Sequence, residues 1–491
     1  MNKKKIIYPA ITAIALAGAI SPSAAQKNKQ PNIIYILADD MGYGDVGCYG
    51  QKYIKTPNID RLAAEGIRFT QHYTSAPVCA PARCCLMTGK HSGHAFVRNN
   101  HELKDSSDFK TGQLPIPDKT ETIAEMLKKH GYTTAIIGKW GLGSIASEGA
   151  PNKQGFDFFY GYADQVHAHN HYPTFLWRND KQEFLPGNIE SVHPKVDRDK
   201  ETGIDEYKKY MGPHYSLDLM TDEAVRFIGE NKKNPFFLYL AYVVPHKALQ
   251  VPDESLKMYE GVFDEQPYDG KRGYTPHPKP LSAYAAMITR MDQKIGTILD
   301  ELKKQGLDEN TIVMFTSDNG PAGGGGLDIR FFNSSGGLRG MKGQVYEGGI
   351  REPFVARWPG KIAPGTVTGH ISAHYDLMAT LAELNGQKLN DTDGISFLPT
   401  LLGNSEKQQR HEYLYWEFSS GGGQYAVRIG NWKGVYSGGF GRNSPKSWKV
   451  YDLSTDESES NDLAAQHPEL VEKFEQIAKQ RIPSHIKEWN F

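Results

Sequence analysis

The sequence of 491 residues has almost no net charge, few cysteines and no long apolar run after its first residues. Its 56 Lys and Arg residues nearly balance 57 Asp and Glu residues, which leaves a formal charge of −1. A protein that binds nucleic acid through bulk positive charge is therefore excluded. No later stretch reaches the ~18 apolar residues of a transmembrane helix, so no stable membrane span is expected. Three of the four cysteines, Cys79, Cys84 and Cys85, lie within seven residues, a poor layout for disulfides that cross-link a large domain.

The N-terminus has the pattern of a secretory signal peptide. Basic residues 3–5 precede an apolar stretch at 6–20, and small residues follow at 23–25. This pattern predicts a signal peptide over residues 1–25 with cleavage before Gln26. Because no cysteine directly follows the apolar stretch, a lipoprotein anchor is not expected. The mature chain is predicted to be secreted, and to be periplasmic in a Gram-negative source.

Apolar runs alternate with amphipathic segments along most of the chain. Residues 33–37 form a continuous apolar run, which is typical of a strand buried on both faces. Thr122 and Glu125 fit a capping box, which predicts a helix that ends before Gly131. Further strands are expected at 133–137, 236–244 and 311–315, and a long helix at 285–302. This alternation predicts an α/β fold with a large, mostly parallel sheet sandwiched by helices.

The pattern changes after about Gly403. Glycine turns separate short segments that predict antiparallel strands at 413–418, 424–429 and 432–436, and a helix is expected at 468–480. We therefore predict a large α/β domain over residues 26–403 and a small C-terminal α+β subdomain over residues 404–491. The polar segment 177–213 is interpreted as an irregular surface insertion.

Polar residues follow four of the predicted strands. They are Asp39 with Asp40, Lys139, His246, and Asp318 with Asn319. Open parallel sheets bind ligands just outside the carboxyl ends of their strands, so we expect these side chains to meet. Their carboxylate and amide oxygens are hard donors that suit Ca²⁺ or Mg²⁺, and the lysine and histidine add positive charge. The set predicts a metal site for sulfate or phosphate, although each residue alone also fits a turn, a cap or the core.

A nucleophile is expected in segment 79–89. Pro81 fits the first position of a helix and Gly89 its C-terminal stop, which places Cys79 just before the helix N-terminus. The helix dipole and the free amides there favour negative charge on Cys79 or on a bound anion. Arg83 lies about one turn into the helix and can reach back toward that charge. These residues predict a nucleophile in a cationic, metal-bearing site.

The same segment resembles the motif of the type I, formylglycine-dependent sulfatases of the alkaline-phosphatase-like superfamily. Residues 79–83 match Cys-x-Pro-x-Arg and residues 86–89 match Leu-x-Thr-Gly, and the two together are highly specific. The resemblance extends from Pro31 to about Leu463 and includes arylsulfatases and bacterial N-acetylgalactosamine sulfatases. Further matching segments lie at 131–134, 138–140, 245–246, 317–320, 338–343, 346–351 and 451–453.

The resemblance implies a secreted sulfuric ester hydrolase that acts on a sulfated saccharide, with a galactose- or N-acetylgalactosamine-type sugar as the expected substrate. In the family, a formylglycine-generating or anaerobic sulfatase-maturating enzyme oxidises the cysteine that matches Cys79 to Cα-formylglycine. One hydroxyl of the hydrated aldehyde attacks sulfur and displaces the alcohol. Elimination of sulfate then regenerates the aldehyde.

The resemblance also implies roles for individual residues. One Ca²⁺ ion is expected to be held by Asp39, Asp40, Cys79 as formylglycine, Asp318 and Asn319. Catalytic roles are implied for Cys79, Arg83, Lys139, His246 and Lys342. Of these, Lys139, His246 and Lys342 also contact the substrate, and His246 or a nearby histidine protonates the leaving alkoxide.

The chain departs from the family at Gly141, where many members have a histidine that contacts the sulfate. A histidine-rich segment follows at residues 167–171, and we expect His169 to take that catalytic place. The alternative is that these histidines lie on the surface or bind sugar. Substrate contacts at the pocket mouth are further expected from three residues after the nucleophile segment, namely His94, Arg98 and Asn99.

Two other functions stay open on the sequence alone. A phosphomonoesterase or phosphonate monoester hydrolase of the same superfamily would have a site of similar charge and geometry. A protein of another class, an inactive binder of sulfated glycans, would account for Gly141. It would not account for the retained nucleophile motif, aspartates and lysines.

Overall fold

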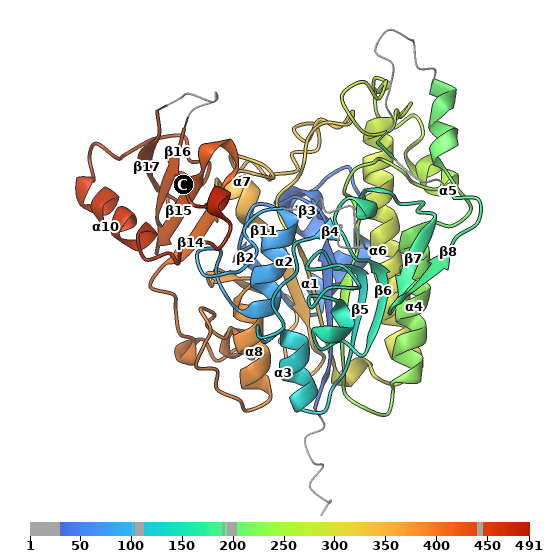
Figure 1. Ribbon diagram of the computed structural model, residues 1–491, viewed down its shortest axis with the longest axis horizontal. Coiled ribbons are helices and arrows are strands. Elements are labelled where there is room, and N and C mark those ends of the chain that lie inside the picture. The colour runs from blue at the N-terminus through green and yellow to red at the C-terminus, as the bar shows by residue number, and fades with distance from the viewer. Residues whose placement is uncertain (1–29, 101, 104–111, 189–191, 194–203, 439–444) are drawn as a thin grey trace, which may run out of the picture. The chain divides into compact units, whose positions relative to one another are not determined.

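A mixed sheet of 11 strands forms the centre of the unit Pro31–Phe491 (Figure 1). Its strands lie in the order β12 (Thr366–Thr368), β2 (Ile67–Tyr73), β11 (Arg351–Arg357), β10 (Thr311–Ser317), β1 (Asn32–Ala38), β9 (Phe236–Ala241), β5 (Thr133–Lys139), β6 (Phe158–Tyr162), β7 (Phe175–Arg178) and β8 (Lys181–Phe184), with β13 (Ser372–Ala373) beside β2. The five neighbouring strands β10, β1, β9, β5 and β6 are parallel. The predicted fold class is therefore confirmed.

This computed structural model describes residues 30–100, 102–103, 112–188, 192–193, 204–438 and 445–491. The predicted signal peptide, residues 1–25, lies outside the described residues. Within them, no helix is both long enough and apolar enough to cross a membrane. The domain boundary expected at residue 403 stays a prediction.

The central strands are buried on both faces, as their apolar runs predicted. All seven residues of β1 are buried, and alternate residues pack into two different clusters. One cluster contains Ile34 and side chains of α1 (Pro57–Ala64), α4 (Ser216–Glu230) and α6 (Pro280–Lys304). The other contains Ile33 and side chains of α2 (Cys79–Thr88), α3 (Ile123–Lys129) and α8 (Asp376–Leu384). Shorter elements are α5 (Asp253–Leu256), α7 (Glu347–Ile350), α9 (Leu398–Leu401), β3 (Glu102–Leu103) and β4 (Gly112–Gln113).

Two sequence-based interpretations of this region were wrong in part. The segment 177–213 is not wholly irregular, because β7 and β8 form an antiparallel hairpin that extends the large sheet beyond β6. The polar, mostly exposed side chains of β8 suit an edge strand that faces water, and this masked its strand character. Helix α6 begins at Pro280 instead of 285, since proline fits the first turn of a helix.

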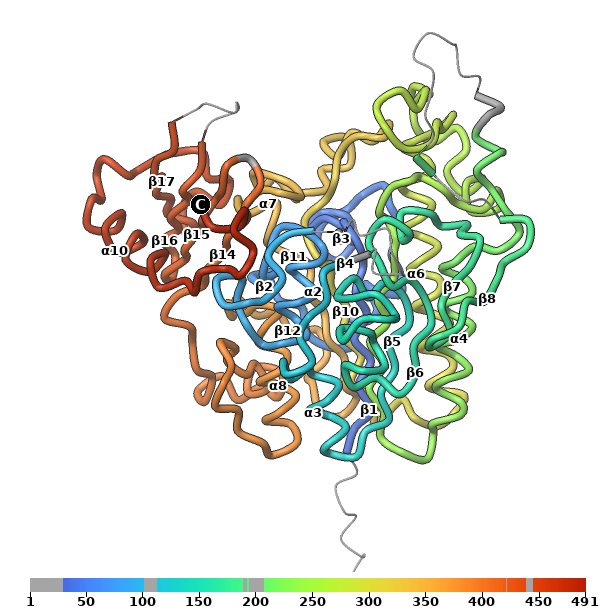
Figure 2. The backbone as a smooth tube through the Cα atoms, viewed as in Figure 1, coloured from blue at the N-terminus to red at the C-terminus, as the bar shows by residue number. Residues whose placement is uncertain are grey.

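The C-terminal region forms a second, antiparallel sheet of four strands (Figure 2). It consists of β14 (Leu414–Phe418), β15 (Gln424–Ile429), β16 (Trp432–Ser437) and β17 (Ser447–Asp452). Helix α10 (Pro468–Ala478) covers one face through Phe474. On the other face Trp416 packs with Tyr73 of β2, and its indole N–H donates to the Thr74 carbonyl at 2.7 Å. The small sheet is thus joined to the large one through a shared apolar cluster.

A buried carboxylate on α6 fixes the start of α1. Asp292 Oδ1 accepts hydrogen bonds from the backbone N–H groups of Asn58 and Ile59 at 2.9 and 2.8 Å. Thr56, the residue that caps α1, makes no side-chain cap bond of its own. Asp292 therefore does from another helix what a capping side chain normally does locally.

We predict that Asp292→Ala lowers the free energy of unfolding by ~1–2 kcal/mol, the usual cost of a lost helix cap. Asp300→Ala is the matched control, because Asp300 is an exposed carboxylate on the same helix. Urea unfolding followed by circular dichroism measures both. Equal stability of the two variants would contradict the capping role.

Candidate active site

The carboxyl ends of the parallel strands bring polar residues together at one edge of the large sheet. They are Asp39, Asp40, Lys139, His246, Asp318 and Asn319, and all six are buried. The register explains the convergence, because Ala38 at the end of β1 lies opposite Ser317 of β10, and Gly138 of β5 lies opposite Ala241 of β9. The chain thus leaves each strand at about the same level.

Two cations approach the carboxylates that follow β1 and β10 from one side. Lys139 Nζ lies 2.7 Å from Asp39 Oδ2. Arg83 donates from Nη2 to Asp318 Oδ2 at 2.8 Å and from Nη1 to the Lys139 carbonyl at 2.7 Å. Because Arg83 is on α2 and bonds both β5 and the loop after β10, it fixes the nucleophile helix against the sheet edge.

Asp40 receives its partners from the other side. Its φ of 65° is left-handed, which turns the chain sharply after β1. Lys342 Nζ lies 2.7 Å from Asp40 Oδ1, and Asn319 Nδ2 donates to the same oxygen at 2.8 Å. His246 Nε2 lies 3.4 Å from Asp40 Oδ2. The structure therefore brings Lys342, far along the chain, to the four strand ends.

Cys79 is the first residue of α2 and not, as expected, the residue before the helix. Val78 is the cap, and the Ala82 N–H donates to the Val78 carbonyl at 3.1 Å. Pro81 is consequently the third helical residue, which costs no hydrogen bond because the first four N–H groups of a helix have no internal acceptor. Gly89 ends the helix at φ 65°, as predicted.

The thiol of Cys79 is not poised as a thiolate. Burial raises its pKa to about 11, and the nearby charges of Lys139 and Lys342 offset this only in part. The expected negative charge on the sulfur is therefore absent at neutral pH. The sequence predicted negative charge at this helix N-terminus either on Cys79 or on a bound anion. The charges of the site favour the bound anion.

The donor set fits a divalent cation. Ligand atoms of Asp39, Asp40, Cys79 and His246 all lie within 4.8 Å of one another. Asp39 Oδ1 and Asn319 Oδ1 are buried and have no hydrogen-bond partner among the described residues. Burial opposes ionisation of Asp39, but the charges of Lys139, His246 and Arg83 outweigh it and hold the pKa of this carboxyl well below its usual range. Ionised, unpartnered oxygens in a buried site are what a Ca²⁺ or Mg²⁺ ion requires.

His169 lies beside His246 at the site. Its ring stacks on His246 with centroids 4.4 Å apart and planes at 10°. His169 is in a short 3-10 helix, His167–His169, and its Nδ1 lies 2.9 Å from Nε2 of His193. At Gly141, φ is 75° and an added Cβ would lie 1.9 Å from Gln165 Nε2. Gln165 therefore fills the space in which a longer side chain at 141 would have to sit.

The three residues expected at the pocket mouth bond to other parts of the protein. His94 Nδ1 lies 3.0 Å from both carboxylate oxygens of Asp393. Arg98 donates to Glu417 Oε1 at 3.0 Å, and Asn99 donates to Ser419 Oγ at 2.7 Å. Glu417 and Ser419 belong to β14 and the loop after it. The substrate contacts of His94, Arg98 and Asn99 stay predictions.

Sequence reasoning missed several neighbours of the site. Asn100, not Asn99, supports the nucleophile helix, since its Oδ1 accepts from the Ala80 N–H at 3.0 Å. Tyr274 lies 5.7 Å from the His169 ring between centroids, and the Lys247 ammonium lies 5.6 Å from the centre of the Tyr274 ring. Asn100 carried no local signal, because the helix that it supports lies earlier in the chain. Tyr274 lies in a loop without a pattern that would assign it.

Known proteins share this arrangement over most of the chain. The family described as Sulfatase matches residues 31–387, and the family described as N-sulphoglucosamine sulphohydrolase, C-terminal, matches residues 341–485. Arylsulfatase A of Homo sapiens is 32% identical over 464 residues, which cover 90% of this chain and 81% of that protein. N-acetylgalactosamine-6-O-sulfatase of Bacteroides thetaiotaomicron is 30% identical over 536 residues, which cover 97% of this chain and 99% of that protein.

A solved structure agrees with this similarity. Ps i-CgsB in complex with k-i-k-neocarrahexaose has a TM-score of 0.73 and 27% sequence identity, and the match covers 92% of this chain and 94% of that one. The two family matches together span the large sheet and the C-terminal sheet. From its family match, its identity to named sulfatases and its fold, the chain belongs to the sulfatase family and is a sulfuric ester hydrolase.

Proposed function

We propose that this enzyme removes sulfate from a sulfated glycan with a galactose- or N-acetylgalactosamine-type sugar, through a formylglycine at position 79 and one bound Ca²⁺ ion. The observation that carries the proposal is the buried cluster of carboxylates and cations that faces Cys79. The N-acetylgalactosamine-6-O-sulfatase relative and the structure with a bound neocarrahexaose support a saccharide substrate.

The charges of the cluster suit a bound divalent cation, and the positive charge of that ion would then attract an anionic substrate. The carboxylates of Asp39, Asp40 and Asp318 are matched by three cations, Arg83, Lys139 and Lys342. A divalent ion held by the three aspartates and Asn319 would leave the site with two positive charges. When bound, this ion would withdraw charge from the sulfuryl oxygens. Burial and the charge of Asp39 raise the pKa of Asp318 to about 7, so the protein's own charges cancel fully only when Asp318 is ionised. The ion would favour that ionised state and give the site its attraction for a sulfate ester.

The side chains around residue 79 have separable roles in the proposed reaction. In the first turn of α2 the Ala80 N–H donates to Asn100, the Ala82 N–H donates to the Val78 carbonyl, and Pro81 has no N–H. An anion at residue 79 would therefore depend mainly on the cationic side chains of the site. Lys139 and Lys342 would hold the sulfuryl oxygens as charge develops on them. Arg83 contacts Asp318 and the Lys139 carbonyl, so it orients the site and its charge.

His246 is the proposed proton donor to the leaving alkoxide. Its Nδ1 is hydrogen-bonded to the Lys247 carbonyl, and Nε2 faces Asp40 and the site. Burial lowers the pKa of His246, so Nε2 carries no proton at rest. Nε2 would take the proton that the attacking hydroxyl of residue 79 releases and pass it to the leaving alkoxide. His171 Nε2 lies 2.8 Å from the His246 carbonyl and holds this turn in place. The stacked ring of His169 supports its proposed place in the same step.

We further propose that a sulfatase-maturating enzyme converts Cys79 before or during export. The N-terminal pattern of residues 1–25 supports secretion, into the periplasm in a Gram-negative host. The maturating enzyme could reach Cys79 in an extended chain, whereas the folded protein leaves only 1% of this residue exposed.

Protein from the native host should release inorganic sulfate from 6-sulfated N-acetylgalactosamine or sulfated galactose and carry formylglycine at position 79. Ion chromatography measures the sulfate, and peptide mass spectrometry measures residue 79. Cys79→Ala should lose turnover while it keeps its fold, because it removes only the reacting group. The matched control is Cys84→Ala, a buried cysteine of the same helix. Faster release of phosphate from the corresponding phosphate esters, or active enzyme with an intact cysteine, would contradict the proposal.

Removal of divalent ions with EDTA should abolish activity and lower the melting temperature, and Ca²⁺ should restore both. Ca²⁺ stabilises the folded state only if it binds the folded site, so the shift reports binding without turnover. Asp318→Asn removes a charged ligand and should lose most of the Ca²⁺-dependent shift. Asp328→Asn, an exposed carboxylate paired with Arg330, is the control. An undiminished shift in Asp318→Asn would place the ion elsewhere.

His169→Ala should lower kcat on the order of 10²-fold, the scale of a lost acid–base group. His246→Ala should be at least as damaging. His467→Ala, a partly exposed histidine near the C-terminal sheet, serves as the control. If His169→Ala instead raises KM with little change in kcat, His169 binds sugar and does not take part in the chemical step.

A further inference from the structure

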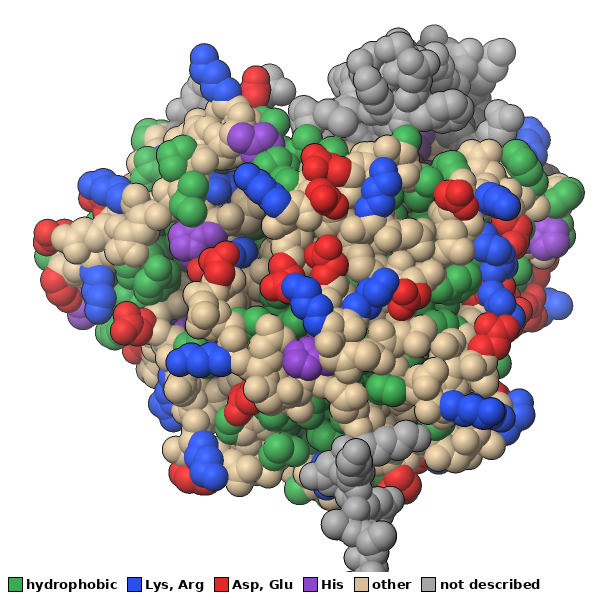
Figure 3. Space-filling view, turned by 60° about the horizontal axis from the view of Figure 1, so that its bottom comes forward, with side chains coloured by type: hydrophobic (Ala, Val, Ile, Leu, Met, Phe, Trp, Pro, Cys, Tyr) green, Lys and Arg blue, Asp and Glu red, His purple; other side chains and the backbone are tan. Residues whose placement is uncertain are grey.

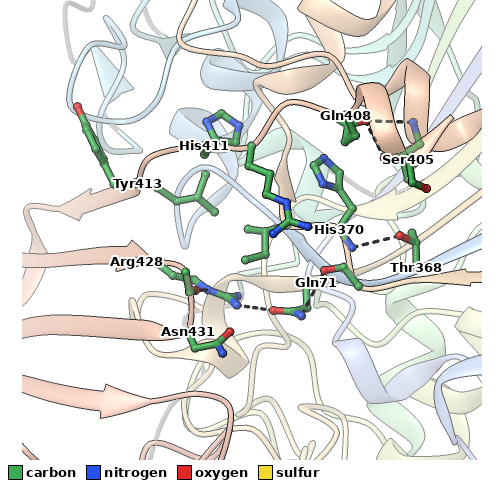
Figure 4. A pocket seen from close by; sticks show the side chains of 15 residues that line it. Gln71, Thr368, His370, Ser405, Gln408, His411, Tyr413, Arg428 and Asn431 are labelled. Carbon is green, nitrogen blue, oxygen red and sulfur yellow. Dashed lines mark hydrogen bonds between the residues drawn. The ribbon is translucent and has the colours of Figure 1, made fainter.

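A second cavity lies on the side of the protein between the two sheets (Figure 4). Its volume is about 570 Å³, which is within the range of small-molecule sites. One wall is the edge of the large sheet at β2 and β12, including Gln71. A second wall is the loop after α9, including Arg410 and His411, and the third is β15 with Arg428. None of the residues at the strand-end site lines this cavity.

The cavity walls carry basic side chains and no acidic ones. Arg410, Arg428 and His411 line it, together with His370, which is neutral at pH 7 because burial lowers its pKa to about 4. No Asp or Glu is among the described lining residues. On the face seen in Figure 3, by contrast, acidic and basic side chains are interspersed. A concave wall with charge of one sign concentrates its field in the cavity and attracts an anion.

The two arginines are not neutralised by carboxylates in contact with them. Arg428 donates to the carbonyl of Gly430 at 2.8 Å, to the Tyr73 hydroxyl and to the Gln71 side-chain oxygen, all of which are neutral. Arg410 is exposed, and no ion pair involves it within the described residues. Arg428 is held rigidly by its three acceptors, whereas Arg410 is free to close on a ligand. This pairing of a fixed and a mobile guanidinium suits a carboxylate or sulfate group.

His411 adds to the positive wall. Burial opposes its protonation, but the charge and the hydrogen bond of Asp376, 2.8 Å from Nε2, outweigh burial and raise the pKa of His411. Asp376 itself is fully buried behind the wall, where it accepts hydrogen bonds from the N–H groups of Ala373 and Ile395. The acidic partner therefore supports the histidine without facing the cavity.

The remaining wall residues are neutral hydrogen-bonding groups of the kind that sugar hydroxyls need. They include Gln408, Thr400, Ser405 and Asn431, with Tyr413 at the rim. Gln408 and Thr400 already bond each other, and the Tyr413 hydroxyl donates to Gln480, so Ser405 and Asn431 are the wall side chains open to a sugar hydroxyl. An inorganic anion would use the arginines and leave those two unused. A sugar ring that bears an acidic group would use both, and the volume accommodates it.

We propose that this cavity is a second saccharide site, which binds an acidic sugar unit, sulfated or carboxylated, away from the reacting centre. The inference rests on the proposed function for its choice of ligand. Such a site would let the enzyme bind the glycan polymer independently of the sugar unit from which it removes sulfate. Glycans with several acidic units would gain affinity by contact at both sites.

Calorimetric titration of the Cys79→Ala protein with the chondroitin 6-sulfate disaccharide tests this without turnover. Two binding events per chain are expected, one at each site. Adding Arg410→Ala should remove one event or raise its Kd at least tenfold. Lys407→Ala is the matched control, because Lys407 is an exposed cation of the same loop that does not line the cavity. It should leave both events unchanged.

The outcomes separate this proposal from the proposed function. If the strand-end site does not bind this sugar, one event is expected, and Arg410→Ala should still weaken it. Binding that is unchanged by Arg410→Ala, or weakened equally by Lys407→Ala, would overturn the second site. Sodium sulfate titrated alone distinguishes the ligand, since equal affinity for inorganic sulfate would show that the cavity holds a free anion and not a sugar.

Discussion

Three carboxylates and the side chains of Lys139 and Arg83 are buried together where strands β1, β5 and β10 end, and the partly exposed Lys342 joins them. Charges without partners would not be tolerated in such a place, because each would lose its hydration without a replacement. Each of the three cations therefore lies within 2.8 Å of a carboxylate. The pairs are Lys139 with Asp39, Lys342 with Asp40, and Arg83 with Asp318. This requirement sets the position of the nucleophile helix and of the loop that carries Lys342. Asp39 Oδ1 and Asn319 Oδ1 make none of these contacts and have no hydrogen-bond partner among the described residues.

The strand-end part of the site could be predicted from the sequence, because apolar runs that stop at polar residues mark where a parallel sheet presents its ligands. The motif at 79–89 located the nucleophile helix, although its first residue was misplaced since a proline can stand anywhere in the first turn. Contacts between segments that lie far apart in the sequence could not be predicted. Gln165 beside Gly141, and Asn100 under the helix, come from loops whose local sequence carries no record of their distant partner.

The C-terminal sheet is linked by hydrogen bonds and ion pairs to the large sheet and to the strand-end site. Its buried Lys433 lies 2.9 Å from Glu347 of α7 and 2.9 Å from Glu459. Glu347 also accepts a hydrogen bond from the Tyr73 hydroxyl at 2.7 Å. The same hydroxyl accepts one from Arg428, which lies in the wall of the second cavity. One hydrogen-bonded chain therefore runs from that cavity into β2. Thr74, next along the chain, donates to the Asp318 carbonyl at 2.6 Å, so the small sheet also supports the strand-end site.

We propose that the strand-end cluster holds one Ca²⁺ ion between the aspartates and residue 79. A crystal structure grown with Ca²⁺ and sulfate, with anomalous scattering data to identify the metal, tests it most directly. The account predicts a single calcium peak about 2.3–2.6 Å from oxygens of Asp39, Asp40, Asp318 and Asn319, with sulfate between the ion, Lys139 and Lys342. Two zinc ions in this place, or a calcium peak away from these four residues, would contradict it.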